Sequence, residues 1–191
     1  MEDTNVLISK KLSYYLRHSL ENLKIPHTED GFVKLDIILA IDTFLNKNSE
    51  LITKVVENNS KKRFEMKEIN GETYIRANQG HSSGKLNDES MLKEIKEPLQ
   101  DCFHGTYKQN ENSIKKKGIS RMTRKHIHIA ESKTSISGMR ANCNLLIYID
   151  MKKALDDGYK FYRSNNGVIL TPGNKDGFLP PEYLVFDKKT V

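Results

Sequence analysis

The stretch RFEMKEINGETYIRA, residues 63–77, decides how the first part of this chain folds. Asn70-Gly71 lies between two segments of strand-forming character, Arg63 to Ile69 and Glu72 to Ala77. Asn-Gly is the dipeptide most typical of the two-residue turn in a β-hairpin, because both turn positions need a backbone conformation that these residues tolerate. The stretch therefore predicts a hairpin with its turn at Asn70-Gly71.

The second strand of this hairpin carries an arginine that we expect to receive an anion. Arg76 precedes Ala77-Asn78-Gln79-Gly80-His81, and no carboxylate follows Glu72 to neutralise it. A basic group without a nearby acid in a structured segment favours phosphate binding. The pair Arg17-His18, far away in sequence, offers the same chemistry. If the fold joins the two segments, this protein binds a phosphate.

Three helices are predicted before the hairpin. Apolar residues at helical spacing between Leu7 and Leu16 form one stripe of the first helix, and Arg17 projects from the opposite, polar face beside Lys10. A second helix is expected from Asp36 through Ile41, and Ser49 is the expected cap of a third. Three helices followed by a hairpin form the winged-helix pattern, which is related to the helix-turn-helix nucleic-acid binders.

The second half of the chain predicts strands with few helices. Strand-like segments are Cys102 to His104, His126 to Ile129, Leu145 to Ile149, Gly167 to Leu170 and Tyr183 to Phe186. A helix from Asn112 to Lys117 is closed by Gly118. The polar segment between the halves has no periodicity and predicts a linker. The predicted class is α+β, with a winged-helix lobe at 1–82, a linker at 83–95 and a β-rich lobe at 96–191.

Composition limits the class of protein and its partners. The 191 residues carry a net charge of +6, from 31 basic and 25 acidic residues, which fits a nucleic-acid or nucleotide partner without demanding one. Two cysteines, Cys102 and Cys143, are too few for a disulfide scaffold and fit reduced thiols. The charged N-terminus and the lack of a long apolar run predict neither a signal peptide nor a membrane span. We expect a monomer in the cytoplasm, the nucleus or both.

Histidines and a third arginine in the second half could take part in chemistry. His104-Gly105-Thr106 turns at a glycine, so its imidazole and hydroxyl could contact a ribose or a phosphate. His126 and His128 share one strand face and could form a zinc site with His104. No Asp or Glu is placed to orient such ligands, so zinc is the weaker alternative. Arg140 follows Ser137-Gly138-Met139 and has no acidic neighbour in sequence.

Taken together, these segments resemble the tRNA 2′-phosphotransferase family. Eight motifs occur in the family's order between Ile8 and about Tyr183. They are Ser9-Lys10-x-Leu12-Ser13-x-x-Leu16-Arg17-His18, Asp30-Gly31-Phe32-Val33, Lys62-Arg63-Phe64, Ile75 to Ser82, His104-Gly105-Thr106, His126 to Ala130, Ile136 to Arg140 and Asn166 to Gly173. Each motif is weak alone, but the ordered set is specific. Ile136 to Arg140 and Ile169 to Gly173 look more like the eukaryotic branch than the bacterial one.

The resemblance implies an RNA-binding winged-helix lobe and an ADP-ribosyltransferase-like lobe that binds NAD⁺. It implies that an internal RNA 2′-phosphate, as left at a tRNA splice junction, attacks the nicotinamide riboside carbon of NAD⁺. The new ribose 2″-hydroxyl then attacks phosphorus, which gives 2′-hydroxyl RNA and ADP-ribose 1″,2″-cyclic phosphate. The family's four catalytic residues fall on Arg17, His18, Arg76 and Arg140. Its NAD⁺-binding residues fall on His104, Gly105, Thr106, Gly118, Ile119 and His128.

The residue types agree with this chemistry. A phosphate anion is already a nucleophile, so the first step needs no general base. Guanidinium groups stabilise the charge of the second step, so no metal is expected. His18 can donate a proton to the phosphate or to the departing oxygen. Candidate RNA contacts are Lys10, Asn78, Gln79 and His81, and the last three could instead shape the junction between the lobes.

Two other functions stay open on the sequence alone. One is a non-catalytic winged-helix RNA-binding protein whose NAD⁺ lobe has decayed. The other is an enzyme that ADP-ribosylates a terminal phosphate of nucleic acid and stops after the first step. The chain departs from the family at Ser19, where many relatives have glycine, and at Glu131 to Ser135, which is shorter than in many eukaryotic relatives. These departures affect the expected RNA and adenosine contacts more than the reaction.

Overall fold

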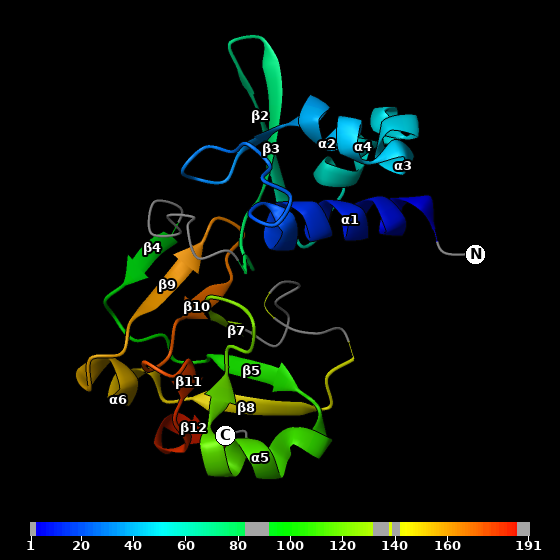
Figure 1. The fold of residues 1–191 in the computed structure, drawn as a ribbon. Coiled ribbons are helices and arrows are strands. Elements are labelled where there is room, and N and C mark those ends of the chain that lie inside the picture. The colour runs from blue at the N-terminus through cyan, green and yellow to red at the C-terminus, as the bar shows by residue number, and fades with distance from the viewer. Residues whose placement is uncertain (1–2, 83–91, 132–137, 139–141, 187–191) are drawn as a thin grey trace. The chain divides into compact units, whose positions relative to one another are not determined.

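The computed structural model describes residues 3–82, 92–131, 138 and 142–186 (Figure 1). The chain divides into two compact units, Met1–Met91 and Leu92–Val191, and each unit has its own hydrophobic core. Helices and small antiparallel sheets build both units, which confirms the α+β class at the level of mixed α and β structure. Across the described ranges, no helix has the length and apolar character that a bilayer crossing needs.

The helices of the first unit precede its hairpin, as predicted. They are α1 (Thr4–Tyr14), the π-helical turn η1 (Tyr15–Ser19), α2 (Leu35–Ile41), α3 (Thr43–Lys47) and α4 (Ser49–Glu57). Ile8, Leu12 and Leu16 are fully buried, which confirms the apolar stripe of the first helix. The prediction of Ser49 as a cap was wrong, because Asn48 holds that position and its side chain makes no capping bond. Helix α3 was not predicted.

The hairpin forms with the predicted register. Strands β2 (Phe64–Ile69) and β3 (Glu72–Ala77) pair from Phe64 opposite Ala77 to Ile69 opposite Glu72, and β1 (Val33–Lys34) pairs with the other edge of β3. Asn70 and Gly71 have φ of 53° and 77°. Two successive positive φ values are what a type I′ turn requires, so this dipeptide sets the register of both strands.

A buried carboxylate holds the helices of the first unit together. Asp42 accepts hydrogen bonds from Lys11 Nζ at 2.7 Å, Tyr15 Oη at 2.9 Å and the Leu45 backbone N–H at 2.9 Å. Burial alone would raise the pKa of Asp42, but these hydrogen bonds outweigh it and hold that pKa below its ordinary value. Burial and the bond to Asp42 raise the pKa of Tyr15 to about 12. The carboxylate therefore links α1, η1 and α3 in its charged form.

Acid will destabilise the first unit through Asp42. Because its pKa is lower in the folded than in the unfolded chain, its stabilisation is complete above about pH 4 and is lost as pH falls through the folded value. We expect Asp42→Asn to lower the free energy of unfolding at pH 7 by about 1.5–3 kcal/mol, the contribution of hydrogen bonds to a charged group. Urea unfolding followed by circular dichroism at pH 7 and pH 3.5 measures both effects.

Asp3→Asn is the matched control for Asp42→Asn. Asp3 caps α1 from an exposed position, where asparagine is an equally good cap, so its substitution should change stability little. If Asp42→Asn were as stable as the wild type at pH 7, or lost as much stability as the wild type on acidification, this account of the cluster would be wrong.

The second unit consists of three small antiparallel sheets with short helices beside them. The sheets have the strand orders β4-β9-β10-β7, β12-β8-β5 and β11-β6. The elements are β4 (Leu92–Ile95), β5 (Phe103–Thr106), η3 (Lys108–Asn110), α5 (Glu111–Lys117), β6 (Ile119–Ser120), β7 (Ile127–Ile129), β8 (Leu145–Ile149), α6 (Met151–Asp156), β9 (Phe161–Ser164), β10 (Ile169–Thr171), β11 (Phe178–Leu179), η4 (Pro181–Tyr183) and β12 (Leu184–Val185). Phe103 and Ala130 exchange two backbone hydrogen bonds of 2.9 Å, which join β5 to the end of β7.

The second unit begins earlier than the predicted linker allows. Leu92 to Ile95 form β4 and pair with β9, from Leu92 opposite Ser164 to Ile95 opposite Phe161. Residues 83–91 of the predicted linker 83–95 lie outside the described residues. The strand was missed because its partner lies far along the sequence. Cys102 and Cys143 are both free thiols, and burial raises the pKa of Cys102 to about 12.

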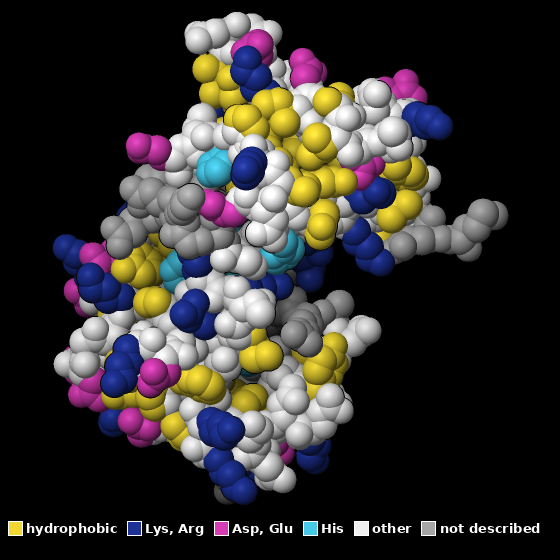
Figure 2. Space-filling model, in the orientation of Figure 1, with side chains coloured by type: hydrophobic (Ala, Val, Ile, Leu, Met, Phe, Trp, Pro, Cys, Tyr) yellow, Lys and Arg dark blue, Asp and Glu magenta, His cyan; other side chains and the backbone are white. Residues whose placement is uncertain are grey.

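On the face drawn in Figure 2, the described charged side chains are of both signs. On the face that Figure 2 shows, Lys and Arg side chains alternate with Asp and Glu side chains over the described parts of both units. The net charge of +6 therefore does not appear there as one basic patch. Net charge alone therefore does not locate a binding site on this face.

Candidate functional site

Arg17 lies in a different environment from the one predicted. It was expected on the polar face of a regular helix, yet its exposed fraction is only 9%. The prediction assumed an even turn of about 100° per residue. Residues Tyr15–Ser19 instead form a π-helical turn, which widens the helix and changes the direction of each side chain. A Cβ on Gly80 would lie 3.6 Å from the Arg17 guanidinium, and the Phe64 ring centroid lies 6.0 Å from Arg17 Cζ.

His18 is tied to the segment that follows the hairpin. Its Nδ1 lies 2.8 Å from Ser82 Oγ, and the Ser82 backbone N–H donates to the Arg17 carbonyl at 2.9 Å. These two bonds join motifs that are 64 residues apart in sequence. The fold therefore brings Arg17-His18 beside Ser82, in the segment that follows β3. His18 itself is exposed.

Arg76 is paired with two carboxylates, so the expectation that no acid neutralises it was wrong. Its Nε and Nη2 donate to Glu65 Oε2 at 3.1 and 2.8 Å, and its Nη1 donates to Asp30 Oδ2 at 3.0 Å. The Phe32 ring centroid lies 4.3 Å from Arg76 Cζ, and the residue is only 7% exposed. Ile75 and Ala77 face the helix core, so Arg76 between them points to the other face of the sheet.

One of these carboxylates was visible in the sequence. A two-residue turn at Asn70-Gly71 places Glu65 directly opposite Arg76, as the structure confirms. The expectation considered only the residues after Glu72 in sequence, whereas this carboxylate lies on the facing strand β2. Asp30 lies 46 residues away, in a turn that no local pattern connects to β3.

The residues after β3 shape the end of the hairpin. Asn78 is buried, its backbone N–H donates to the Arg63 carbonyl at 2.9 Å, and its Nδ2 donates to the Lys62 carbonyl at 2.8 Å. His81 is buried as well, whereas Gln79 is half-buried. These contacts hold Asn78 against the start of the hairpin within the first unit. Lys10 lies on α1.

In the second unit, two predicted cofactor residues lie side by side. His104 on β5 has its Nδ1 2.8 Å from the His128 carbonyl oxygen on β7. A carbonyl only accepts, so His104 Nδ1 carries the proton in this hydrogen bond. The Thr106 hydroxyl, two residues along β5, accepts a hydrogen bond from Asn110 Nδ2 at 3.2 Å. Gly105 stands between them and is buried.

Gly118 and Ile119 are positioned by a different sheet. Gly118 ends α5 with φ of 87°, and Ile119 pairs with Leu179 across β6 and β11. A Cβ on Gly118 would lie 2.9 Å from the Leu179 carbonyl carbon and 2.9 Å from Pro180 Cα. Backbone packing alone therefore requires glycine at this position, whether or not NAD⁺ binds there.

Arg140, the fourth predicted catalytic residue, lies outside the described residues. Its neighbour Gly138 is described, with φ of 91°. A Cβ there would lie 2.9 Å from the Ile129 carbonyl oxygen, so Gly138 packs against the end of β7, next to His128 in sequence.

The three-histidine zinc alternative finds no support in the geometry. The His126 ring packs edge-on against Tyr162, with 6.2 Å between ring centroids, and His104 points its Nδ1 at a backbone carbonyl. Within the part of the chain that the structure describes, no three His, Cys, Asp or Glu side chains gather as metal ligands would.

Comparison with known proteins gives the identity of the chain. The family described as RNA 2′-phosphotransferase, Tpt1 / KptA matches residues 3–173. The tRNA 2′-phosphotransferase 1 of Bos taurus is 44% identical over 190 residues, which cover 95% of this chain and 74% of that protein. The protein of the same name from Homo sapiens is 43% identical over 189 residues, which cover 95% and 75%. A probable RNA 2′-phosphotransferase of Flavobacterium johnsoniae is 37% identical over 183 residues, which cover 94% of each chain.

The animal relatives are more similar to this chain than the bacterial one is, which agrees with the eukaryotic character of its motifs. The match spans nearly all of the chain, including the hairpin and the histidine-bearing strands. The chain therefore belongs to the RNA 2′-phosphotransferase, Tpt1 / KptA family and is a transferase.

Proposed function

We propose that this enzyme removes an internal 2′-phosphate from RNA, in particular from spliced tRNA, by transferring it to NAD⁺. The first unit would be a winged-helix RNA lobe and the second an ADP-ribosyltransferase-like lobe, in a monomer that acts inside the cell. The observation that carries the proposal is the hydrogen bond between His18 and Ser82, because it joins two motifs that each contain a residue expected from the family resemblance to be catalytic, His18 and Arg76.

The proposed reaction has two steps that conserve all atoms. In the first, a 2′-phosphate oxygen bonds to C1″ of the nicotinamide riboside, and the bond to nicotinamide breaks with its electron pair leaving on the ring nitrogen. In the second, the ribose 2″-hydroxyl loses its proton and bonds to phosphorus, while the RNA 2′-oxygen leaves and takes up a proton. The products are nicotinamide, 2′-hydroxyl RNA and ADP-ribose 1″,2″-cyclic phosphate.

Different side chains would stabilise charge, donate a proton and bind NAD⁺ in these two steps. Arg17, Arg76 and Arg140 would stabilise charge on the phosphate oxygens, which is greatest in the second step. When the Ser82 hydroxyl donates to His18 Nδ1, the ring proton sits on Nε2, which can then donate to the departing RNA oxygen. In the second unit, His104 would contact a ribose of NAD⁺, as the family resemblance implies, with its ring oriented by the bond from Nδ1 to the His128 carbonyl.

Ser82 is a positioning residue in this proposal, and its loss should weaken catalysis through His18. We expect Ser82→Ala to lower kcat roughly tenfold, the value of one hydrogen bond, with little change in KM. Ser82→Thr keeps the hydroxyl and should restore most of kcat. The pH dependence of kcat should also shift in Ser82→Ala, because His18 loses the partner of Nδ1. An alanine variant with a wild-type pH profile and wild-type kcat would contradict this role.

Release of nicotinamide tests the proposed function. We expect nicotinamide to form from NAD⁺ only when the RNA carries a 2′-phosphate, with one nicotinamide per phosphate lost. The same RNA without the 2′-phosphate is the control. No release with the phosphorylated RNA would favour the non-catalytic RNA-binding protein. Release without loss of phosphate from the RNA would favour an enzyme that stops after ADP-ribosylation.

A further inference from the structure

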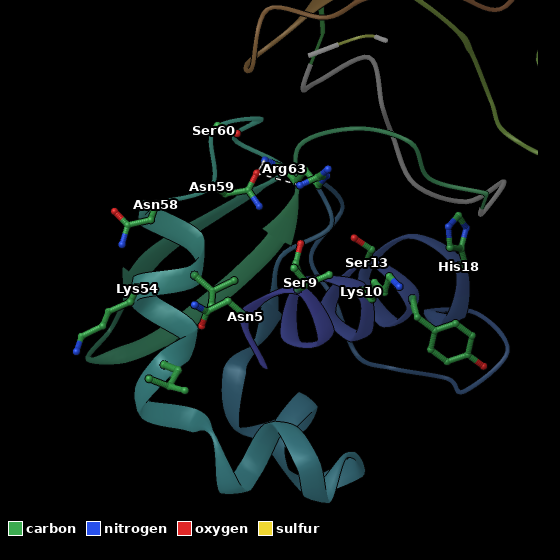
Figure 3. A pocket seen from close by; sticks show the side chains of 14 residues that line it. Asn5, Ser9, Lys10, Ser13, His18, Lys54, Asn58, Asn59, Ser60 and Arg63 are labelled. Carbon is green, nitrogen blue, oxygen red and sulfur yellow. Dashed lines mark hydrogen bonds between the residues drawn. The ribbon is translucent and has the colours of Figure 1, made fainter. Parts of the chain in front are cut away.

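The first unit contains a groove that begins at His18 and runs away from it between α1 and the end of α4. Its volume is about 760 Å³, and Ser9, Lys10 and Ser13 of α1 line one wall. Figure 3 shows His18 at one end and Lys54 at the other, with Arg63 over the middle. Ligand pockets span roughly 300–1,000 Å³, so this groove is far larger than one phosphate group needs.

The lining of the groove suits a polyanion. It includes the cations Lys10, Lys54 and Arg63, and none of the described side chains that line it is a carboxylate. Asparagine, serine and tyrosine side chains fill the space between the cations and can donate hydrogen bonds to phosphate oxygens.

Positive charge is crowded where α4 leads into the hairpin. Burial lowers the pKa of Arg63, and burial together with the charge of Arg63 lowers the pKa of Lys61. Arg63 Nη1 donates to Asn59 Oδ1 at 3.3 Å, a neutral partner that fixes the guanidinium without compensating its charge. A bound anion would stabilise both cations here.

An exposed aromatic side chain adds a site for a base. Tyr14 lines the groove and is 55% exposed. Its ring packs edge-on against Tyr15, with 5.2 Å between centroids, which holds the ring in place and leaves it accessible. Cations that follow a backbone, with an aromatic ring on which a base stacks, are the usual features of single-stranded nucleic-acid binding.

We propose that this groove holds the single-stranded RNA that flanks the 2′-phosphate, with its backbone running from His18 past Lys10 and Arg63 to Lys54. The assignment of the His18 end to the reacting phosphate rests on the proposed function. The groove would make the enzyme prefer a 2′-phosphate inside a longer strand to one on a dinucleotide. It also gives Lys10 a specific place among the candidate RNA contacts.

Direct binding tests the groove without any chemistry. The probe is a fluorescein-labelled RNA of about eight nucleotides without a 2′-phosphate, followed by anisotropy in the absence of NAD⁺. Lys54→Ala and Arg63→Ala should each weaken binding about two- to fivefold and together about tenfold, as expected for exposed ion pairs. Each lost cation should reduce the slope of log K against log salt by about 0.7. Tyr14→Ala should weaken binding at least about fivefold through lost stacking.

Lys47→Ala is the matched control, since Lys47 is an exposed lysine at the end of α3 outside the groove lining. Thermal unfolding of each variant checks that the fold is kept. Unchanged binding in the groove variants, or a loss as large in Lys47→Ala, would overturn the proposal, and so would a wild-type chain that does not bind the probe. If the groove variants lose binding but the wild type releases no nicotinamide, the groove stands and the proposed reaction fails.

Discussion

Arg76→Ala will lower phosphate transfer about 100- to 1,000-fold and cause the ADP-ribosylated RNA to accumulate, as expected when one preorganised charge-stabilising donor is lost. In the proposed mechanism the second step should suffer more than the first, because its pentavalent phosphorus would carry more charge than the entering phosphate. Rapid quenching, followed by separation of RNA, ADP-ribosylated RNA and cyclic product, measures the two steps. Arg76→Lys should not restore transfer, because an ammonium lacks the planar fork that holds Glu65 and Asp30 together.

The structure also offers the control for this result. Glu65 and Asp30 expose 39% and 34% of their side chains, so water can solvate them when Arg76 is removed, and we expect the variant to stay folded. Glu65→Gln disturbs the same cluster while keeping the guanidinium, and it should leave transfer within a few-fold of the wild type. Equal losses in both steps, or an equal loss in Glu65→Gln, would show that Arg76 acts only through the structure.

Gly118→Ala will destabilise the second unit far more than any substitution on its surface. A residue other than glycine at φ of 87° costs about 1–3 kcal/mol. The new Cβ would also overlap the Leu179 carbonyl group of β11, and such overpacking adds about 1–3 kcal/mol. Chemical unfolding followed by circular dichroism should show a lower free energy of unfolding, and activity should fall with the folded fraction.

Gly158→Ala separates the two contributions. Gly158 has φ of 88°, nearly the same as Gly118, but a Cβ there would meet nothing within 4 Å. It should therefore cost only the backbone strain. If the two alanine variants were equally stable, the close approach to Leu179 would not matter. If Gly118→Ala stayed fully stable but lost activity, direct contact with NAD⁺ would be the better explanation.

Local sequence patterns predicted the parts of the fold that depend on interactions between residues close in sequence. Asn70-Gly71 predicted both the turn and the register, because a type I′ turn needs two positive φ values. The apolar stripe of α1 was also confirmed, because its spacing is a property of one helix. The ordered motifs predicted the family, which the match over residues 3–173 then established.

The parts that were missed depend on contacts between distant residues or on irregular helix geometry. Asp30 was missed as a partner of Arg76 because it reaches Arg76 from a separate turn, whereas the hairpin register already placed Glu65 opposite Arg76. Arg17 was expected on a solvated face because a π-helical turn leaves no clear signal in composition. Strand β4 depends on its pairing with β9. Ile95 at the end of β4 lies opposite Phe161 at the start of β9, 66 residues later in the sequence. The roles of the site residues stay predictions that the variants above test.

The fate of one phosphorus atom tests the central claim most directly. An RNA with a single ³²P-labelled internal 2′-phosphate is incubated with the enzyme, with and without NAD⁺. We predict that the label moves to ADP-ribose 1″,2″-cyclic phosphate only when NAD⁺ is present, while the RNA keeps its length and gains a 2′-hydroxyl. Label that appears as inorganic phosphate without NAD⁺, or that stays on the RNA in its presence, would contradict the account.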